Sequence, residues 1–180
     1  MAAPLIAVVI PCFNQGRFLA DAIRSVRVTG RDAVEIVVVD DGSTDETAAV
    51  AKQFPHVTYR RQSHAGLAPA RNLGLAESHA EFVVFLDADD MLTPDALETG
   101  AVALEANPHC AFATGRCLMT DAYGRLQPTP AYPRLTCDAY TELLRHNYIW
   151  MPAMAMFRRS ALVEAGGVDP AEHAAADYDL

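Results

Sequence analysis

Residues 82–90 read Phe-Val-Val-Phe-Leu-Asp-Ala-Asp-Asp, and this stretch decides the fold class. The first five residues are an uninterrupted apolar run, which is typical of a strand buried on both faces. Three carboxylates then follow within four residues, beginning at Asp87. A buried strand that ends on acidic groups predicts a parallel sheet with a polar site at the carboxyl ends of its strands.

Three upstream segments are also predicted strands. Residues 5–10 form an apolar run that stops at Pro11, and residues 36–39 form another that stops at Asp40. Residues 57–60 form a weaker and more peripheral strand. The strong strands therefore end on polar or turn-forming groups, which a parallel sheet brings to one edge.

The segments between these strands have the spacing of amphipathic helices. Their apolar faces are Leu19, Ala22, Ile23 and Val26 in one segment and Thr47, Val50, Ala51 and Phe54 in the next. Residues 43–46 read Ser-Thr-Asp-Glu and predict a capping box for the second helix. Pro69 lies near the first turn of another helix, and Pro94 takes the first helical position of the next. Alternating strands and helices predict an α/β domain.

The pattern becomes less regular after about residue 107. The elements expected there are a strand at 110–119, a turn at 121–125, an irregular Pro-rich segment at 126–135, a helix at 136–146 capped by Thr136, a strand at 154–157 and a short helix at 160–165. The chain stops at Asp177-Tyr178-Asp179-Leu180, which reads as the start of a helix. We therefore expect the sequence to be a fragment.

Composition excludes several classes of function. The 180 residues carry a net charge of −9, with 51% apolar and 21% charged residues. Such a chain fits one globular domain and lacks the basic surface that binds nucleic acid or anionic membranes. Its four cysteines have no C-x-x-C pair, which disfavours zinc and fits a reducing cytoplasm.

The acidic turn after residue 86 is the first candidate site. Carboxylates as close as Asp87, Asp89 and Asp90 raise one another's pKa unless a cation offsets them, and Mg²⁺ or Mn²⁺ is the natural partner. The alternative is a solvated turn before a helix. Asp40, at a strand end, is placed to accept a hydrogen bond from a ligand, whereas Asp41 beside it is interpreted as a turn residue.

Two further residues are candidates on weaker grounds. Arg71 lies near a predicted helix N-terminus, where a positive charge is unfavourable unless an anion is close. The alternative for Arg71 is a surface position. The histidines have no metal-ligand spacing, and His64 is the least certain of them because it precedes the turn at Gly66.

With these motifs in place, the sequence resembles a family 2 glycosyltransferase with the GT-A fold. The segments that carry the resemblance are residues 8–14, 37–45, 70–74 and 85–90, and residues 156–169 also fit. The resemblance implies a Rossmann-like, mostly parallel sheet flanked by helices and one domain. Residues 1–107 would be its nucleotide-sugar-binding half, and residues 108–180 the truncated start of an irregular acceptor-binding half.

The resemblance also implies roles for single residues. Pro11 and Phe13 would line a uracil pocket, while Asp40 would bond the base with Arg71 beside it. The remaining implied roles are Asp87 at the ribose, Asp89 at an Mn²⁺ or Mg²⁺ ion on the diphosphate, and Asp177 as the catalytic base. Ala176 replaces the acidic residue that usually precedes this base.

The implied activity is inverting transfer of a sugar from a UDP-sugar to a hydroxyl of a saccharide or lipid-linked acceptor, in glycan or polysaccharide synthesis. Membrane association would come only through a missing C-terminal region. The alternative is a non-catalytic nucleotide-sugar-binding module. A dinucleotide-binding oxidoreductase is excluded by the absence of G-x-G-x-x-G after a strand.

Overall fold

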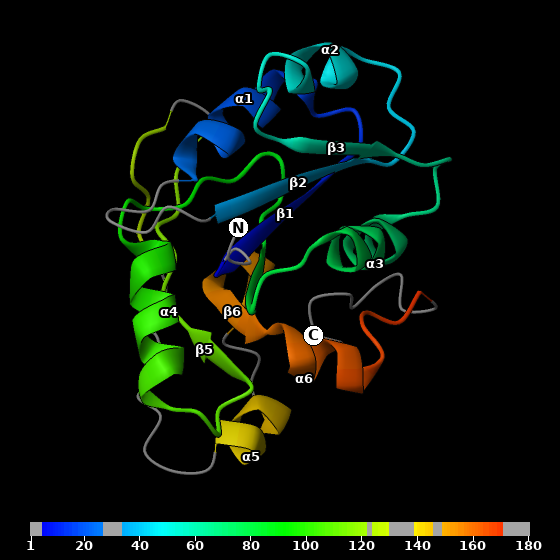
Figure 1. Ribbon diagram of the computed structural model, residues 1–180. Coiled ribbons are helices and arrows are strands. Elements are labelled where there is room, and N and C mark those ends of the chain that lie inside the picture. Colours follow the sequence, from blue (N-terminus) through cyan, green and yellow to red (C-terminus); the bar gives the residue numbers. More distant parts are fainter. Residues whose placement is uncertain (1–4, 27–33, 122–123, 130–138, 146–148, 171–180) are drawn as a thin grey trace.

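The computed structural model describes residues 5–26, 34–121, 124–129, 139–145 and 149–170. In these ranges the strands are β1 (Ile6–Cys12), β2 (Val34–Asp40), β3 (Thr58–Arg61), β4 (Phe82–Phe85), β5 (Phe112–Thr114) and β6 (Ala155–Arg158). The helices are α1 (Gly16–Ser25), α2 (Thr47–Ala51), α3 (Leu67–Glu77), α4 (Ala96–Ala106), α5 (Ala139–Arg145), α6 (Arg159–Ala165) and the 3₁₀ turn η1 (Pro152–Met154) (Figure 1). None of the helices in the described ranges is long and apolar enough to span a bilayer.

The strands form one mixed sheet in the order β3-β2-β1-β4-β6-β5. Strands β1 to β4 are parallel, as predicted, and β6 runs antiparallel to both β4 and β5. Cys12 lies opposite Asp40, and Val9 lies opposite Phe85. The carboxyl ends of β1, β2 and β4 therefore meet at one edge of the sheet, which confirms the predicted α/β architecture.

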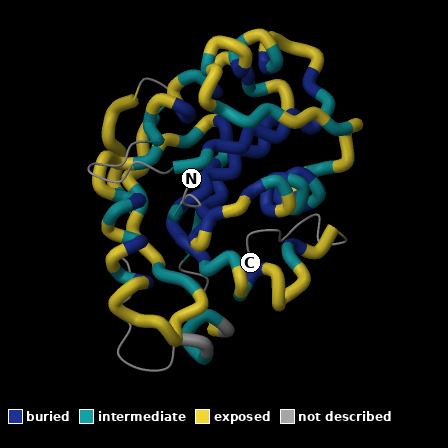
Figure 2. The backbone as a smooth tube through the Cα atoms, in the orientation of Figure 1, coloured by how far each residue is buried: buried dark blue, intermediate teal, exposed yellow. Residues whose placement is uncertain are grey.

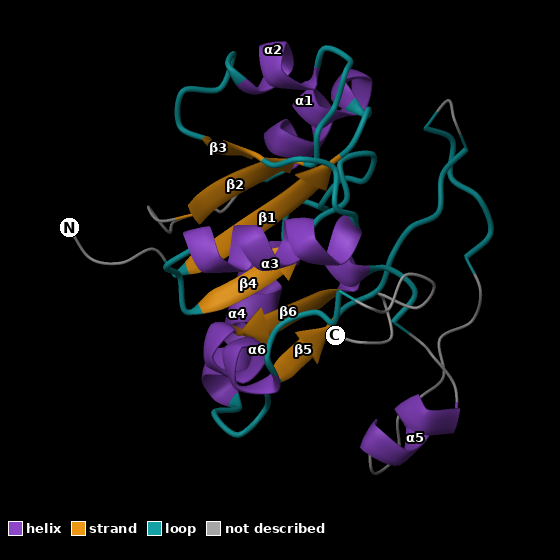
Figure 3. Cartoon of the chain, turned by 90° about the vertical axis from the view of Figure 1, so that its right-hand side faces the viewer, coloured by secondary structure: helices purple, strands orange, loops and turns teal. Residues whose placement is uncertain are grey.

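Helices cover both faces of the sheet (Figure 3). Side chains alternate across a strand, so Val8 and Val38 face one layer while Val9 and Val39 face the other. The first layer includes α1, α2 and α4, and the second includes α3 and α6. Figure 2 shows the buried strands at the centre of these layers. The continuous apolar runs thus exist because both faces of each central strand are buried.

The capping box predicted at residues 43–46 is wrong. The carboxylate of Asp45 accepts a hydrogen bond from the Thr47 backbone N–H at 3.0 Å, whereas the Ser43 hydroxyl is used elsewhere. Neither Ser43 nor Glu46 makes a side-chain cap on α2. The longer reach of Asp45 lets one carboxylate bond Thr47 and the distant Gly16 N–H together.

Two boundaries also differ from the expectation. Helix α4 begins at Ala96 rather than at Pro94, because Thr93 accepts the Ala96 N–H and closes a turn first. The strand expected at 110–119 is only Phe112–Thr114, because β6, its partner among the described residues, has four residues. Gly166 ends α6 in the left-handed conformation, with φ of 93°. Thr136 lies outside the described residues.

Gly74 is required where α3 crosses β1. A Cβ atom at this position would lie 2.1 Å from Cγ1 of Val9, a fully buried strand residue that cannot move aside. We expect Gly74→Ala to lower the free energy of unfolding by about 1–3 kcal/mol through overpacking. Gly100→Ala in α4 is the matched control, since the atoms it meets belong to the flexible side chain of Met156. Urea denaturation of both variants tests this, and equal stability of the two would contradict it.

Candidate functional site

A pocket of about 450 Å³ opens at the carboxyl edge of β1, β2 and β4. Of the residues proposed from sequence, it contains Pro11, Phe13, Asp87 and Asp89. Asp40 and Arg71 do not line it, and Asp177 lies outside the described residues. The other wall residues are Cys12, Gln15, Asp41, His64, Gly66, Leu67 and Ala70.

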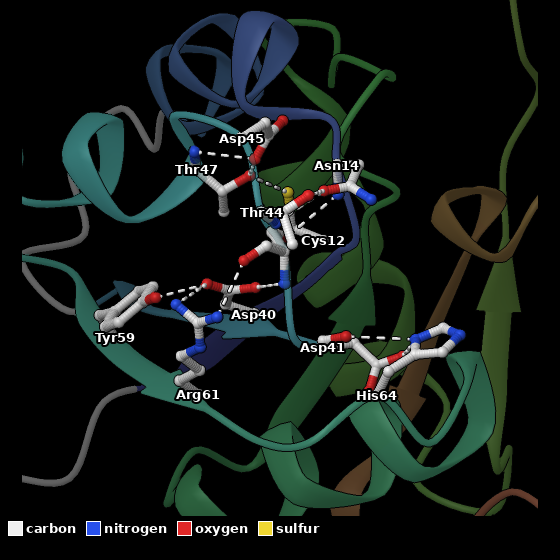
Figure 4. A network of polar contacts seen from close by, with 11 residues as sticks. Cys12, Asn14, Asp40, Asp41, Thr44, Asp45, Thr47, Tyr59, Arg61 and His64 are labelled. Carbon is white, nitrogen blue, oxygen red and sulfur yellow. Dashed lines mark hydrogen bonds and ion pairs between the residues drawn. The ribbon is translucent and has the colours of Figure 1, made fainter.

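The loop after β1 is clamped to the loop after β2 (Figure 4). Asn14 adopts a left-handed conformation with φ of 54°, and its backbone N–H donates to the Ser43 hydroxyl at 3.0 Å. The Gly16 N–H donates to the Asp45 carboxylate at 2.8 Å. These contacts fix the loop that carries Phe13, a residue that is 43% exposed. The Phe13 side chain is thereby held on the pocket wall.

Asp40 is fully buried and bonded within the protein. One carboxylate oxygen accepts the Ser43 N–H at 2.7 Å, and the other accepts the Tyr59 hydroxyl at 2.5 Å. Burial, together with this negative partner, raises the pKa of Tyr59 to about 12. Arg61 approaches the second oxygen at 3.9 Å. Asp40 therefore holds the loop after β2 in place and does not line the pocket, and the base contact expected for it from sequence stays a prediction.

Asp41, rather than Asp40, lies on the pocket wall. Its Oδ1 accepts from Gln62 Nε2 at 2.7 Å and from the Ala65 N–H at 2.8 Å. Its Oδ2 accepts from the Gly66 N–H at 2.9 Å and contacts His64 Nδ1 at 2.8 Å. Burial raises the pKa of Asp41, but these hydrogen bonds outweigh burial and hold the pKa below its usual value. Sequence reasoning missed this carboxylate as a wall residue.

The turn after β4 is acidic and only partly neutralised. Arg71, fully buried in α3, donates to Asp87 at 3.3 Å, so the anion expected near Arg71 is this carboxylate. Asp89 is exposed. Burial, followed by repulsion from Asp87 and Asp89, raises the pKa of Asp90 to about 6. The turn thus attracts a cation.

The donor set of this turn fits Mg²⁺ or Mn²⁺. Within the part of the chain that the structure describes, no group of three or more His, Cys, Asp or Glu side chains could hold a metal alone. Hard divalent cations often bind through one or two carboxylates and complete their shell with water and phosphate oxygens. The exposed carboxylate of Asp89, on the pocket wall, matches that mode.

Asp89 also lines a second pocket, of about 570 Å³. Its walls include Asp90, Arg116, Leu118 and Met154, so it combines charged and apolar groups. Asp89 is therefore shared by the two pockets.

The chain matches a protein-family model and individual glycosyltransferases. The Glycosyl transferase family 2 model matches residues 7–166. An uncharacterized glycosyltransferase of Rickettsia conorii is 35% identical over 105 residues, which are 57% of this chain and 17% of that protein. The chain therefore spans only a minor part of that relative.

Solved structures share the fold. Staphylococcus aureus TarS residues 1–349, in complex with UDP, match with a TM-score of 0.75 at 22% identity, covering 97% of this chain and 53% of that one. The mannosyltransferase PcManGT from Pyrobaculum calidifontis, in complex with GDP-Man and Mn²⁺, matches with a TM-score of 0.64 at 23% identity, covering 94% and 49%.

Proposed function

Because the chain belongs to glycosyl transferase family 2 and has the GT-A fold, we propose that it binds a UDP-sugar and transfers the sugar, with inversion, to an acceptor hydroxyl. The observation that carries the proposal is one pocket that joins the Phe13 ring, the Asp41 carboxylate and the acidic turn at Asp87 and Asp89. The Phe13 ring would stack on the base, Asp41 would accept the ring N–H of the base, and the acidic turn would hold a cation on the diphosphate. The TarS structures with UDP and with UDP-GlcNAc support this choice of nucleotide.

The base would stack on Phe13 beside Pro11, since both line the pocket and Phe13 presents an exposed ring. The ring N–H of uracil needs an acceptor, and Asp41 offers a carboxylate whose lowered pKa keeps it ionised. The sequence assigned this contact to Asp40. Asp40 does not line the pocket, and its oxygens are bonded to Ser43 and Tyr59. Asp41 lines the pocket, so Asp41 is the better candidate.

The diphosphate would lie toward the acidic turn. A negative chain binds a negative diphosphate only with local compensation, and Asp89 would hold the divalent cation that supplies it. When bound, such a cation neutralises the departing diphosphate. Arg71 orients Asp87 through its 3.3 Å contact, leaving Asp87 toward the ribose. The second pocket, which shares Asp89, would receive the transferred sugar and the acceptor.

The proposal predicts that UDP binds at least tenfold more tightly than CDP. Uracil offers a ring N–H to Asp41, whereas cytosine offers an acceptor there, and two buried acceptors facing one another cost about 1–3 kcal/mol. Calorimetry of both nucleotides with Mn²⁺ measures the ratio. Asp41→Asn should shrink it, and Phe13→Ala should weaken both nucleotides. If CDP or GDP binds as tightly as UDP, the uridine assignment is wrong.

A further inference from the structure

The base end of the pocket already holds a planar ring. The imidazole of His64 stacks on Phe13, with ring centroids 4.0 Å apart and an interplanar angle of 18°. Phe13 comes from the loop after β1, and His64 lies between β3 and α3. Both side chains are substantially exposed, at 43% for Phe13 and 57% for His64. The stack therefore forms at the pocket surface rather than in the core.

The same imidazole also forms a hydrogen bond with Asp41 (Figure 4). Its Nδ1 lies 2.8 Å from Asp41 Oδ2 and 3.2 Å from the Asp41 carbonyl oxygen. An ionised carboxylate only accepts, so Nδ1 donates its hydrogen there. Gln62, Ala65 and Gly66 fill the other positions of this carboxylate. His64 therefore occupies the acceptor site that the proposed base contact needs.

We propose that His64 is an internal stand-in for the nucleobase. Its ring reproduces the two contacts assigned to uracil, stacking on Phe13 and donating a ring N–H to Asp41. A third ring between Phe13 and His64 would require roughly twice their 4.0 Å separation. A uridine nucleotide therefore binds only after the imidazole swings out. This inference rests on the proposed nucleotide site.

The backbone around His64 is fixed by contacts that do not involve the imidazole ring. The Ala65 and Gly66 N–H groups are bonded to Asp41, and the Gln62 N–H donates to the Asp40 carbonyl. A Cβ on Gly42 would lie only 2.9 Å from the His64 nitrogen, so the two loops pack closely. Rotation of the imidazole breaks its own contacts and leaves the loop bonds intact. The ring can therefore exchange with a ligand without unfolding the loop.

When His64 occupies the pocket, the apparent affinity for UDP falls in proportion to the fraction of protein molecules in which the pocket is open. We expect His64→Ala to tighten UDP binding by about fivefold, as for a pocket open roughly one-fifth of the time. Pyrophosphate with Mn²⁺ should bind the variant and the native protein within twofold, because it does not reach Phe13. His79→Ala is the control, since His79 is a 78% exposed histidine that does not line the pocket. Calorimetry measures each affinity.

Weaker or unchanged UDP binding by His64→Ala would overturn the inference. Weaker binding would make His64 a direct contact of the base. In the native protein, the Hε1 resonance of His64 should also move on UDP addition, as the ring leaves the shielding of Phe13; no movement at saturation is a second contrary result. The proposed function fails separately, when UDP does not bind the native protein or when Phe13→Ala binds it equally well.

Discussion

Asp89→Asn should weaken UDP binding in the presence of Mn²⁺ by about a hundredfold, equivalent to about 2.7 kcal/mol. Asp89 is the exposed carboxylate of the acidic turn, and it lines both pockets. The chain carries a net charge of −9, and Arg71, which lies against this turn, is engaged with Asp87. Removing the anchor of a divalent ion therefore leaves the diphosphate facing carboxylates. Calorimetry with Mn²⁺, and again with EDTA, measures the loss.

Asp95→Asn is the matched control for this variant. It removes another exposed carboxylate, which lies at the start of α4 and does not line the pocket that contains Phe13 and Asp89. Its UDP affinity should stay within twofold of that of the native protein. The comparison separates the effect of removing one negative charge from the effect of removing the residue that would hold the metal ion. EDTA should weaken native binding about as much as Asp89→Asn does. Equal UDP affinity with and without metal would refute the role of Asp89.

The sequence predicted the edge of the sheet at which the candidate pocket lies. The alternation of side chains along a strand could have improved the choice of residues. Val39 and Phe85 face the α3 layer, and Asp41 and Asp87 lie two residues further along those chains. Asp40 shares its side with Val38 and points toward the other layer, where Tyr59 packs. Counting by two from the buried valines would thus have favoured Asp41 over Asp40 for the pocket.

Other parts of the site were beyond sequence reasoning, because they depend on contacts between distant residues. The bond from Asn14 to Ser43 joins positions 29 apart, and nothing local distinguishes it from a helix cap. The stack of His64 on Phe13 joins two loops whose approach is set by the order of the strands. The central strands could be predicted because burial on both faces requires a continuous apolar sequence. Contacts between loops could not be predicted, because they depend on how the sheet is assembled.

Asp177→Asn should lower turnover by about 10²–10⁴-fold, the usual cost of losing a general base. Inversion is a single displacement at the anomeric carbon, so a base must take the acceptor proton on the face opposite the departing diphosphate. Asp89 is assigned to the diphosphate, and the base must therefore come from another part of the chain. Asp177 lies outside the described residues, and its assignment rests on its place in the sequence, after Gly166 and Gly167.

The variant separates catalysis from binding when it is measured in the full chain. UDP affinity should stay within about threefold, because the base acts on the acceptor rather than on the nucleotide. Asp179→Asn is the control, since two residues further on it points to another face of the expected helix. Near-normal turnover of Asp177→Asn would remove Asp177 from the mechanism, and a product with retained anomeric configuration would remove inversion. Tight UDP binding by a native protein that transfers no sugar would instead favour a non-catalytic binding module, the reading that Ala176 keeps open.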